Sequence, residues 1–411
     1  MTTFIAAGSN LNDRQKNLLS AVKALIQAGY HVTGVSPVYE TPAALLYDTA
    51  KDDWNKPYLN CLIRLETKKS AFELLADLKK IEKNTGRNAV ERWAPRPIDL
   101  DIIEHNDEHI DTPELCVPHK QYLKRSFVLD PLSCFKAVPP EFLYTETHQP
   151  LIMGILNITP DSFSDGGQNN QPGVFEKKAA LWADYLIPLI DVGAESTRLG
   201  ARPLDPAEEI QRLATVFDFV KNREKTPFSP RFSIDTYHFE TARKALENGF
   251  DLLNDIHGLD DPEMLSLAKE HKDKPCIFMH NRDLTGLPLK NTVEVVEQWL
   301  EEKINLFEQN GLCPHNMIFD PGIGFGKTAC QSLQILQNLS KFHRFGVRLL
   351  IGHSRKSFMK IFTDKPPIQK DTETLGISIK IAEKTDILRV HTPLEHKEAL
   401  LAAAHLENQF F

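Results

Sequence analysis

From residue 151 onward the chain contains eight short apolar runs, and each of them ends in a polar residue. The runs cover residues 152–157, 186–191, 232–235, 252–254, 276–280, 317–320, 349–354 and 387–391. Parallel strands are buried on both faces, so they read as continuous apolar stretches rather than as alternating ones. The arrangement predicts a (β/α)8 TIM barrel, an α/β fold whose chemistry lies in the loops at the strand C-termini. We therefore expect the eight polar end groups to surround one pocket.

Amphipathic segments occupy the intervals between these runs, as the outer helices of a barrel require. Clear examples are residues 206–220, 240–249, 262–271 and 293–311. The stretch 376–388 is several residues short of a full helix. We therefore expect a truncated or irregular helix in the final repeat, with fewer turns than usual.

The residues before the barrel are about as numerous as a second domain requires. Their pattern predicts a strand at 3–7, a helix at 13–28, strands at 31–40 and 58–66, a helix at 71–83 and a strand at 98–104. This βαββαβ order is that of an α+β ferredoxin-like domain. Prolines without periodicity mark the seam, so we expect a first domain at 1–140, a linker at 141–150 and the barrel at 151–411.

Composition narrows the class of protein. The chain is 41% hydrophobic and 25% charged, and no apolar run approaches the roughly 20 residues of a membrane helix. The net charge is -8 and lysines and arginines form no tract, which argues against a nucleic-acid surface. No signal peptide precedes the first strand-like run, and the six cysteines are scattered. We therefore expect a cytoplasmic protein without membrane or nucleic-acid partners.

Two carboxylates stand two residues apart on a predicted strand of the first domain, at Asp99 and Asp101. Residues at this spacing point to the same face of a sheet, where two acids repel unless a cation lies between them. Hard oxygen ligands favour Mg²⁺, which binds one or two carboxylates together with phosphate oxygens. Nearby arginines suited to phosphate are Arg87, Arg92, Arg96 and Arg125. The alternative is an exposed acidic strand face with surface ion pairs.

The expected barrel mouth combines amide, carboxylate and cationic groups. It would collect Asn157, residues 159–167 and 195–198, Asp235, Asn254, His280, Asp320, Lys356, Arg389 and His391. Such a mixture can pair with the donor and acceptor edge of a polar heterocycle and can also bind an anion. For any single residue the alternative is a structural role at a strand end, as a turn former or helix cap.

The run 322–328 is rich in glycine and ends in Lys327 and Thr328, which is reminiscent of a nucleotide-binding loop. Its first required glycine is replaced by Pro321, so we do not interpret it as an ATPase motif. The glycines are better explained by a close approach of the backbone to a ligand at the strand end.

Several strings across the first domain resemble 6-hydroxymethyl-7,8-dihydropterin pyrophosphokinase. They are Gly8-Ser9-Asn10, Tyr39-Glu40-Thr41-Pro42, Tyr58-Leu59-Asn60, Gly86-Arg87, the block 92–101, Val117-Pro118-His119 and Arg125-Ser126-Phe127. The resemblance implies that aromatic rings sandwich the pterin and that an Asn side chain reads its edge. The pterin-binding residues that it implies are Thr41, Pro42, Tyr58, Asn60, Trp93 and Phe127.

The same resemblance implies transfer of a whole pyrophosphate group from ATP, with release of AMP. Asp99 and Asp101 would hold two Mg²⁺ ions that bridge the ATP phosphates. The residues implied around the nucleotide are Glu82, Arg87, Arg92, Arg96, His119 and Arg125. Arg87 and Arg96 would join the two aspartates in catalysis.

The barrel resembles dihydropteroate synthase, a sulfonamide target, over residues 151–400. The matching strings are the block 156–167, Glu195-Ser196-Thr197-Arg198, Asp320-Pro321-Gly322, Ser354-Arg355-Lys356-Ser357 and Arg389-Val390-His391. The resemblance implies a pterin pocket at Asp235, Asn254, Asp320 and Lys356. It implies that diphosphate and one Mg²⁺ lie at Asn157, Arg198, Arg389 and His391. It also implies that Thr197, Phe325 and Ser357 frame p-aminobenzoate.

The two resemblances support each other because the product of the first reaction is the substrate of the second. We therefore interpret the chain as a bifunctional folate-biosynthesis enzyme with small-molecule substrates and a possible homodimer through the barrel. One alternative is a pterin-binding methyltransferase, which shares the pterin pocket. The other is a binding protein that retains pterin affinity without turnover.

Overall fold

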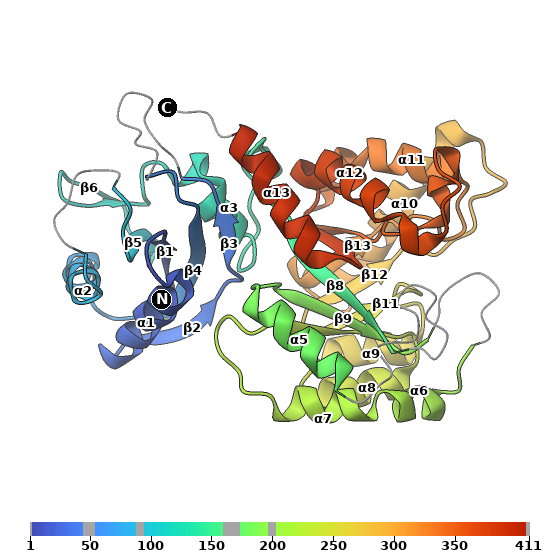
Figure 1. The fold of residues 1–411 in the computed structure, drawn as a ribbon, viewed down its shortest axis with the longest axis horizontal. Coiled ribbons are helices and arrows are strands. Elements are labelled where there is room, and N and C mark those ends of the chain that lie inside the picture. Colours follow the sequence, from blue (N-terminus) through green and yellow to red (C-terminus); the bar gives the residue numbers. More distant parts are fainter. Residues whose placement is uncertain (1, 44–53, 88–93, 159–172, 196–202, 408–411) are drawn as a thin grey trace. The chain divides into compact units, whose positions relative to one another are not determined.

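The computed structural model describes residues 2–43, 54–87, 94–158, 173–195 and 203–407. The chain forms two compact units, one consisting chiefly of the residues before Pro150 and the other chiefly of residues 150–399 (Figure 1). Within the described parts of the chain, no helix has both the length and the apolar character needed to cross a bilayer.

The first unit is built on a five-stranded antiparallel sheet in the order β2-β4-β1-β5, with β3 paired to β4. The strands are β1 (Thr2–Ser9), β2 (His31–Val35), β3 (Tyr39–Thr41), β4 (Tyr58–Glu66) and β5 (Asp99–His105). The helices are α1 (Arg14–Gln27), α2 (Ala71–Asn84), α3 (Ser126–Leu132) and α4 (Pro140–Leu143). Helix α2 begins with a capping box, in which Ser70 and Glu73 satisfy each other's backbone N–H groups. The predicted α+β arrangement is confirmed.

The predicted single strand at 31–40 is instead two strands, β2 and β3. The break falls at Ser36 to Val38 and contains Pro37, which has no N–H to donate to a sheet ladder. Ser36 stabilises the break, because its Oγ accepts a hydrogen bond from Leu62 N at 2.9 Å. A short hairpin of β6 (Ile110–Asp111) and β7 (Cys116–Val117) follows β5.

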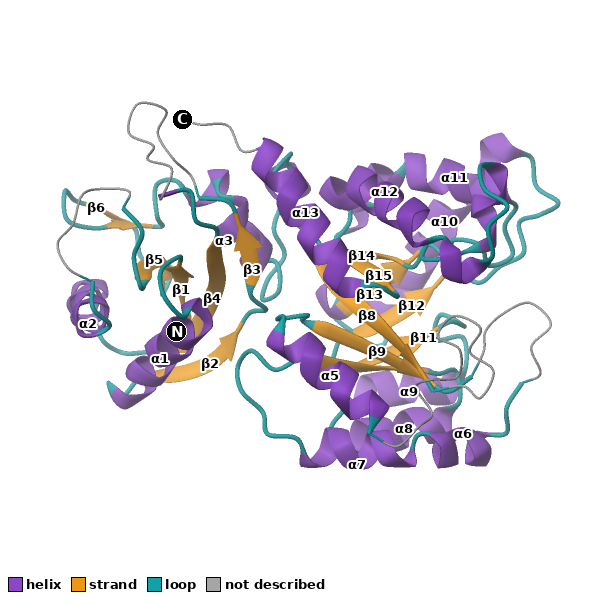
Figure 2. Ribbon diagram, viewed as in Figure 1, coloured by secondary structure: helices purple, strands orange, loops and turns teal. Residues whose placement is uncertain are grey.

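The second unit is a closed barrel of eight parallel strands surrounded by helices (Figure 2). The strands are β8 (Leu151–Asn157), β9 (Leu189–Gly193), β10 (Arg231–Asp235), β11 (Leu252–Asp255), β12 (Cys276–Met279), β13 (Met317–Asp320), β14 (Arg348–Ile351) and β15 (Ile387–Val390). Each overlaps one of the eight apolar runs, and β15 closes the ring onto β8. The predicted TIM barrel is confirmed.

The outer helices follow the strands in alternation. They are α5 (Val174–Asp184), α6 (Pro206–Arg212), α7 (Ala214–Asn222), α8 (Phe239–Glu247), α9 (Pro262–Glu270), α10 (Thr292–Gln309), α11 (Ala329–Gln337), α12 (Asp371–Ile381) and α13 (Pro393–Glu407). The helix predicted at 206–220 divides at Leu213 into α6 and α7. The expectation of a shortened final-repeat helix was wrong: α12 has 11 residues, against 9 in α8 and α11. It begins at Asp371, well before Gly376.

Short 3-10 helices complete the connections. They are Tyr122–Lys124 in the first unit, and Leu289–Asn291, Pro314–Asn316, Leu339–Lys341, His343–Phe345, Ser357–Ile361, Pro367–Gln369 and Ala382–Lys384 in the second.

Two predicted strand ends lie elsewhere than expected. Strand β9 begins only at Leu189, because Leu186 occupies a turn with φ 56°, and it continues past Asp191 to Gly193. Asp191 is therefore an interior strand residue. His280 was expected at the mouth, but its ring packs edge-on against Trp299 of α10 at 5.0 Å. Phe278, two residues earlier, stacks on the same Trp299 ring at 6.1 Å. His280 therefore lies between the barrel wall and a helix.

Candidate active sites

The carboxylate pair of the first unit lies at the start of β5. Arg87 Nη1 lies 2.6 Å from Asp99 Oδ1, and Arg96 Nη1 lies 3.3 Å from Asp99 Oδ2. The structure thus brings together three of the residues that were predicted for the nucleotide side. Asp101 lies two residues further along the same strand, on the same face.

Glu82 is a buried carboxylate that contacts both Arg87 and the backbone of β5. It is 2% exposed, its carboxylate forms an ion pair with Arg87, and its Oε1 accepts a hydrogen bond from Leu100 N at 2.9 Å. Lys79 Nζ lies 3.0 Å from Glu82 Oε2. Glu82 was predicted to lie around the nucleotide, but these contacts show that it fixes Arg87 and the backbone between the two aspartates.

The electrostatics of the pair fit a divalent cation. Burial, together with the neighbouring charge of Asp99, raises the pKa of Asp101 to about 6. Both groups can be ionised together at neutral pH only if positive charge offsets their repulsion. Mg²⁺ commonly takes only one or two protein carboxylates, so Asp99 and Asp101 are a suitable donor set.

Other predicted nucleotide residues surround the cluster. His119 N donates to Ile103 O at 3.0 Å, and burial together with Arg125 lowers the pKa of its ring. The guanidinium of Arg125 lies 5.5 Å from the ring centre of Phe127 and donates to Gln121. Arg92 lies outside the described residues.

The predicted pterin residues cluster on β3 and β4. Asn60 and Thr41 are both 6% exposed, and Asn60 Nδ2 donates to Thr41 Oγ1 at 2.8 Å. Burial raises the pKa of the Tyr58 hydroxyl. Pro42 follows β3 directly, and Phe127 packs partly against the core beneath α3. Trp93 lies outside the described residues, so its pairing with the pterin stays a prediction.

Gly8 of β1 connects the two parts of this site. It is paired with Asn60 of β4 on one side and with Asp99 of β5 on the other. Directly opposed residues of antiparallel strands share a face, so Asn60 and Asp99 face the same side, two strand spacings or roughly 10 Å apart. A Cβ at Gly8 would lie 3.0 Å from Asn60 Oδ1, which explains the need for glycine.

The centre of the barrel site is an arginine between two carboxylates. Arg389 Nε lies 2.6 Å from Asp191 Oδ2, and its Nη2 lies 2.5 Å from Asp235 Oδ2. Asn254 Nδ2 donates to the same Asp191 oxygen at 3.1 Å. Three predicted residues thus meet around Asp191, which is fully buried.

Burial shapes the charge of this centre. It raises the pKa of Asp235 to about 7, with Arg389 opposing the shift and Asp191 adding to it. Burial likewise raises the pKa of Asp320, whose Oδ1 accepts from Gly322 N at 2.8 Å. Burial alone would lower the pKa of Arg389, but the carboxylates of Asp191 and Asp235 outweigh it and keep the guanidinium charged.

Lys356 and Phe325 lie at the next part of the mouth. The Lys356 ammonium is 3.8 Å from the centre of the Phe325 ring, a close cation–π contact. Ser357 is exposed at the start of the following 3-10 helix. Thr197, the third residue predicted for the aminobenzoate, lies outside the described residues.

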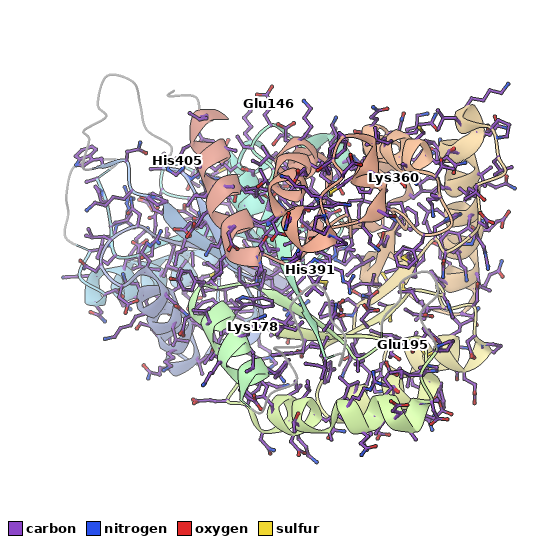
Figure 3. The ribbon with its side chains drawn as sticks, turned by 45° about the vertical axis from the view of Figure 1, so that its right-hand side comes forward. Glu146, Lys178, Glu195, Lys360, His391 and His405 are labelled. Atoms are coloured by element: carbon purple, nitrogen blue, oxygen red, sulfur yellow. The ribbon has the colours of Figure 1, made fainter. Side chains whose placement is uncertain are left out.

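His391 follows β15 and is held by Ser354. The Ser354 Oγ lies 2.9 Å from His391 Nδ1 and accepts from the His391 backbone N–H at 3.3 Å. This arrangement favours the ring form with hydrogen on Nε2, which leaves that nitrogen as a donor. Figure 3 labels His391, together with Glu195 at the end of β9. Asn157 ends β8, whereas Arg198 lies outside the described residues.

Two supporting residues were missed in the sequence. Asp191 was taken for a strand end, and Ser354 was quoted only as part of a motif. The residues that they orient are distant in sequence, since Asp191 is 198 residues from Arg389 and Ser354 is 37 residues from His391, so spacing gave little signal. Strand alternation offered one clue, because Asp191 stands two residues before Gly193 in an otherwise apolar strand.

Family models match both units. Residues 4–137 match the model described as 7,8-dihydro-6-hydroxymethylpterin-pyrophosphokinase, and residues 153–391 match the model of pterin binding enzymes. The second match alone covers more than half of the chain.

Individual relatives agree. The chain is 32% identical to the folate synthesis bifunctional protein of Chlamydia muridarum, over 98% of this chain and 99% of that protein. It is 32% identical to the folic acid synthesis protein fol1 of Schizosaccharomyces pombe, but spans 57% of its length. The solved dihydropteroate synthase of Xanthomonas albilineans with 4-aminobenzoic acid matches 64% of this chain and 95% of its own, with TM-score 0.57 and 29% identity. The chain therefore belongs to the family of bifunctional folate-synthesis enzymes, in which a hydroxymethyldihydropterin pyrophosphokinase precedes a dihydropteroate synthase.

Proposed function

We propose how the described residues carry out the two consecutive reactions of this family. The first unit transfers pyrophosphate from ATP to 6-hydroxymethyl-7,8-dihydropterin and releases AMP. The second unit joins the resulting pterin diphosphate to p-aminobenzoate, which gives 7,8-dihydropteroate and diphosphate. The assignments of residues to roles are the proposal.

In the kinase site, Asn60 and Thr41 bind the pterin edge and Tyr58 stacks on the ring. Asp99 and Asp101 would hold two Mg²⁺ ions, which would supply positive charge to neutralise the ATP phosphates. Arg87 and Arg96 bind the transferred phosphates, and Glu82 keeps Arg87 in place. The observation that carries this part is the pairing of Gly8 with both Asn60 and Asp99, because it supports a pterin and a phosphate chain lying side by side.

Around the nucleotide, we assign His119, Arg125 and Arg92 to the remaining ATP contacts. Trp93, Pro42 and Phe127 complete the walls of the pterin subsite in this proposal. The hydroxymethyl oxygen attacks the β-phosphorus of ATP. The bond between the β-phosphorus and the oxygen that it shares with the α-phosphate then breaks, and AMP leaves with that oxygen. Guanidinium groups favour this step because they bind the phosphate oxygens on which charge accumulates.

In the synthase site, Asp235, Asn254, Asp320 and Lys356 hold the pterin, while Arg389 and His391 face the diphosphate. The observation that carries this part is Arg389 held between two carboxylates. A guanidinium fixed in this way is preorganised for the leaving diphosphate, as electrostatic catalysis requires. Arg198 would add a second guanidinium, and Asn157 offers an amide oxygen to the single Mg²⁺ of this site.

The carbon–oxygen bond between the pterin methylene and diphosphate breaks to give a cationic pterin. The amine of p-aminobenzoate then attacks the methylene and loses a proton. Thr197, Phe325 and Ser357 frame the aminobenzoate in this proposal, with Lys356 between it and the pterin. The contact of the Lys356 ammonium with the Phe325 ring supports a shared wall between the two substrates.

A homodimer through the barrel is also proposed. Four large apolar side chains are exposed in one stretch of the barrel sequence, namely Ile361, Phe362, Ile368 and Ile379. If these side chains form one contiguous patch in this proposal, they would suit pairing with a second copy of the barrel. Light scattering of the wild type and of Phe362→Glu would test the assignment, because a charge in the interface should give monomers.

A reducing, cytoplasmic location completes the proposal. All six cysteines, which lie in the described chain, are free, as is usual where thiols are kept reduced. Fractionation of the source cells would test it.

A coupled assay tests the two activities. The purified chain is supplied with 6-hydroxymethyl-7,8-dihydropterin, ATP, Mg²⁺ and p-aminobenzoate, and AMP and dihydropteroate are measured together. We expect both products from the wild type and AMP alone from Lys356→Ala. Unchanged dihydropteroate formation in that variant would contradict the role of Lys356.

A further inference from the structure

Lys327 is a buried lysine that the proposed mechanism does not use. Its side chain is 8% exposed. Its ammonium donates to two backbone carbonyls, His280 O and Phe325 O, each at 2.9 Å. The first carbonyl follows β12, and the second belongs to the loop that follows β13. Lys327 therefore ties two neighbouring barrel loops together.

The loop around Lys327 is folded tightly enough to make this bond possible. Gly322 and Gly326 have φ values of 68° and 57°, in the left-handed region that favours glycine. A Cβ at Gly322 would lie 2.2 Å from His280 O, and one at Gly326 would lie 2.5 Å from Arg282 O. The two loops are therefore in backbone contact at both glycines.

A second bond reinforces the same contact, since Leu284 N donates to Gly326 O at 2.6 Å. Gln331 Nε2 in turn donates to Leu284 O at 2.6 Å. Phe325 lies between the two glycines, with its carbonyl on Lys327 and its ring under the Lys356 ammonium at 3.8 Å. The position of the Phe325 ring thus depends on the bonds that hold its backbone.

We propose that Lys327 is a positioning residue for the aminobenzoate subsite, because its two carbonyl bonds fix the loop that presents the Phe325 ring to Lys356. The inference rests on the proposed role of Phe325 at that subsite. It differs from a phosphate-binding role, which the glycine-rich sequence alone would have suggested, because the ammonium hydrogens are directed at carbonyl oxygens inside the protein.

The electrostatic environment agrees with a role based on hydrogen bonds rather than on charge. Burial lowers the pKa of Lys327 to about 7, and Asp320 only partly opposes the shift. An ammonium group that loses one proton becomes an amine with two N–H groups, which is the number that the two carbonyls require.

The test compares Lys327→Met with a matched control, Lys274→Met. Lys274 also donates to two carbonyls, Leu246 O at 3.3 Å and Phe250 O at 2.6 Å. It precedes β12, however, so it lies at the end of the barrel opposite the mouth. Both variants lose the same kind of bond, which separates a general loss of stability from an effect on the subsite.

We expect Lys327→Met, which removes both carbonyl bonds, to raise the KM for p-aminobenzoate at least about tenfold, the factor that corresponds to the net contribution of a single hydrogen bond. The KM for pterin diphosphate should change much less, and Lys274→Met should change neither. If Lys327→Met is not folded by circular dichroism, Lys327→Gln replaces it. The Gln side chain is one atom shorter and cannot make both carbonyl bonds, so the KM for p-aminobenzoate should again rise. Equal changes in both KM values, or no change, would overturn the inference.

A double-mutant cycle with Phe325→Ala provides a readout that a merely structural lysine would not move. If Lys327 acts through the Phe325 ring, adding Lys327→Met to Phe325→Ala should not raise the KM for p-aminobenzoate further. Additive effects would overturn the inference. Failure of the wild type to form dihydropteroate would instead refute the proposed function itself.

Discussion

Asp191 and Arg389 are 198 residues apart in the sequence, yet Asp191 Oδ2 lies 2.6 Å from Arg389 Nε inside the barrel. The same oxygen accepts from Asn254 Nδ2, so one buried carboxylate orients two residues of the proposed pterin and diphosphate site. Fixed groups of this kind keep catalytic donors in one geometry before the substrate arrives.

Asp191→Asn should therefore reduce condensation while leaving pyrophosphate transfer unchanged. Removing one charge from a buried pair typically costs about 3–5 kcal/mol. We expect kcat/KM for dihydropteroate formation to fall at least tenfold, and steady-state assays of both reactions would measure it.

Asp251→Asn serves as a control, because Asp251 pairs with Arg223 at 2.9 Å near the start of β10, away from the mouth. A similar loss of condensation in both variants would show that stability, rather than the orientation of Arg389, is responsible.

Replacing Asp99 and Asp101 together by Ala should abolish AMP formation but leave condensation of supplied pterin diphosphate intact. The two carboxylates are the proposed Mg²⁺ ligands, and without them the ATP phosphates lose their counter-charge. AMP release and Mg²⁺ titration would follow the effect. Glu104→Gln on the same strand is the control, since Glu104 is engaged by Lys136. Loss of both activities in the double variant would mean that the sites are not independent.

Gly8→Ala should raise the KM for hydroxymethyldihydropterin more than the KM for ATP. The added Cβ would lie 3.0 Å from Asn60 Oδ1, so the Asn60 side chain must move by a few tenths of an ångström, and it would contact the Tyr58 ring at 3.4 Å. Gly34→Ala on β2 is a matched control, because the added Cβ would lie 2.9 Å from the Phe135 ring. If Gly8→Ala altered only the KM for ATP, Asn60 would not be a pterin ligand.

The raised pKa of Asp235 predicts a pH-dependent stability. Because its pKa is about 7 in the folded protein and about 3.9 in unfolded chains, the folded state binds more protons between these values. Its contribution to stability therefore falls as pH rises from about 4 to 7.

Melting temperatures of the wild type and of Asp235→Asn, compared from pH 5 to pH 8, would measure this dependence. The wild type should lose stability relative to the variant as pH rises to about 7, and the difference should then level off. A difference that grows in favour of the wild type over this range would contradict the shift.

Much of the fold could be predicted because a parallel strand that is buried on both faces appears in the sequence as a continuous apolar run. All eight apolar runs became barrel strands, and Met317–Asp320 matched residue for residue. Two placements were wrong because a polar residue in an apolar run can either end the strand at the barrel mouth or lie elsewhere in the barrel wall. Asp191 was interpreted as the end of a strand although it points into the barrel, and His280 was placed in the mouth although it faces Trp299. Side chains alternate between the two faces of a strand, and the presence of a polar residue does not by itself show which face that residue is on.

The candidate site residues, Glu82 among them, were predicted from motifs, whereas the supporting roles of Glu82, Asp191 and Ser354 were not. Glu82, Asp191 and Ser354 act through contacts between residues far apart in sequence, and such contacts become visible only when the chain is folded. Helix α12 illustrates a related limit, because its start at Asp371 depends on the loop before it rather than on the composition of residues 376–388.

Arg389 lies on the last strand of the barrel, and this position affects the order in which the parts of the enzyme can fold. Strand β15 is inserted between β14 and β8, so the strand that closes the barrel also carries the cation on which Asp191 and Asp235 converge. During synthesis on the ribosome, N-terminal domains fold first, whereas the barrel cannot close before β15 has been made. The barrel therefore gains its closed ring and Arg389, the proposed diphosphate-binding group, in a single late event.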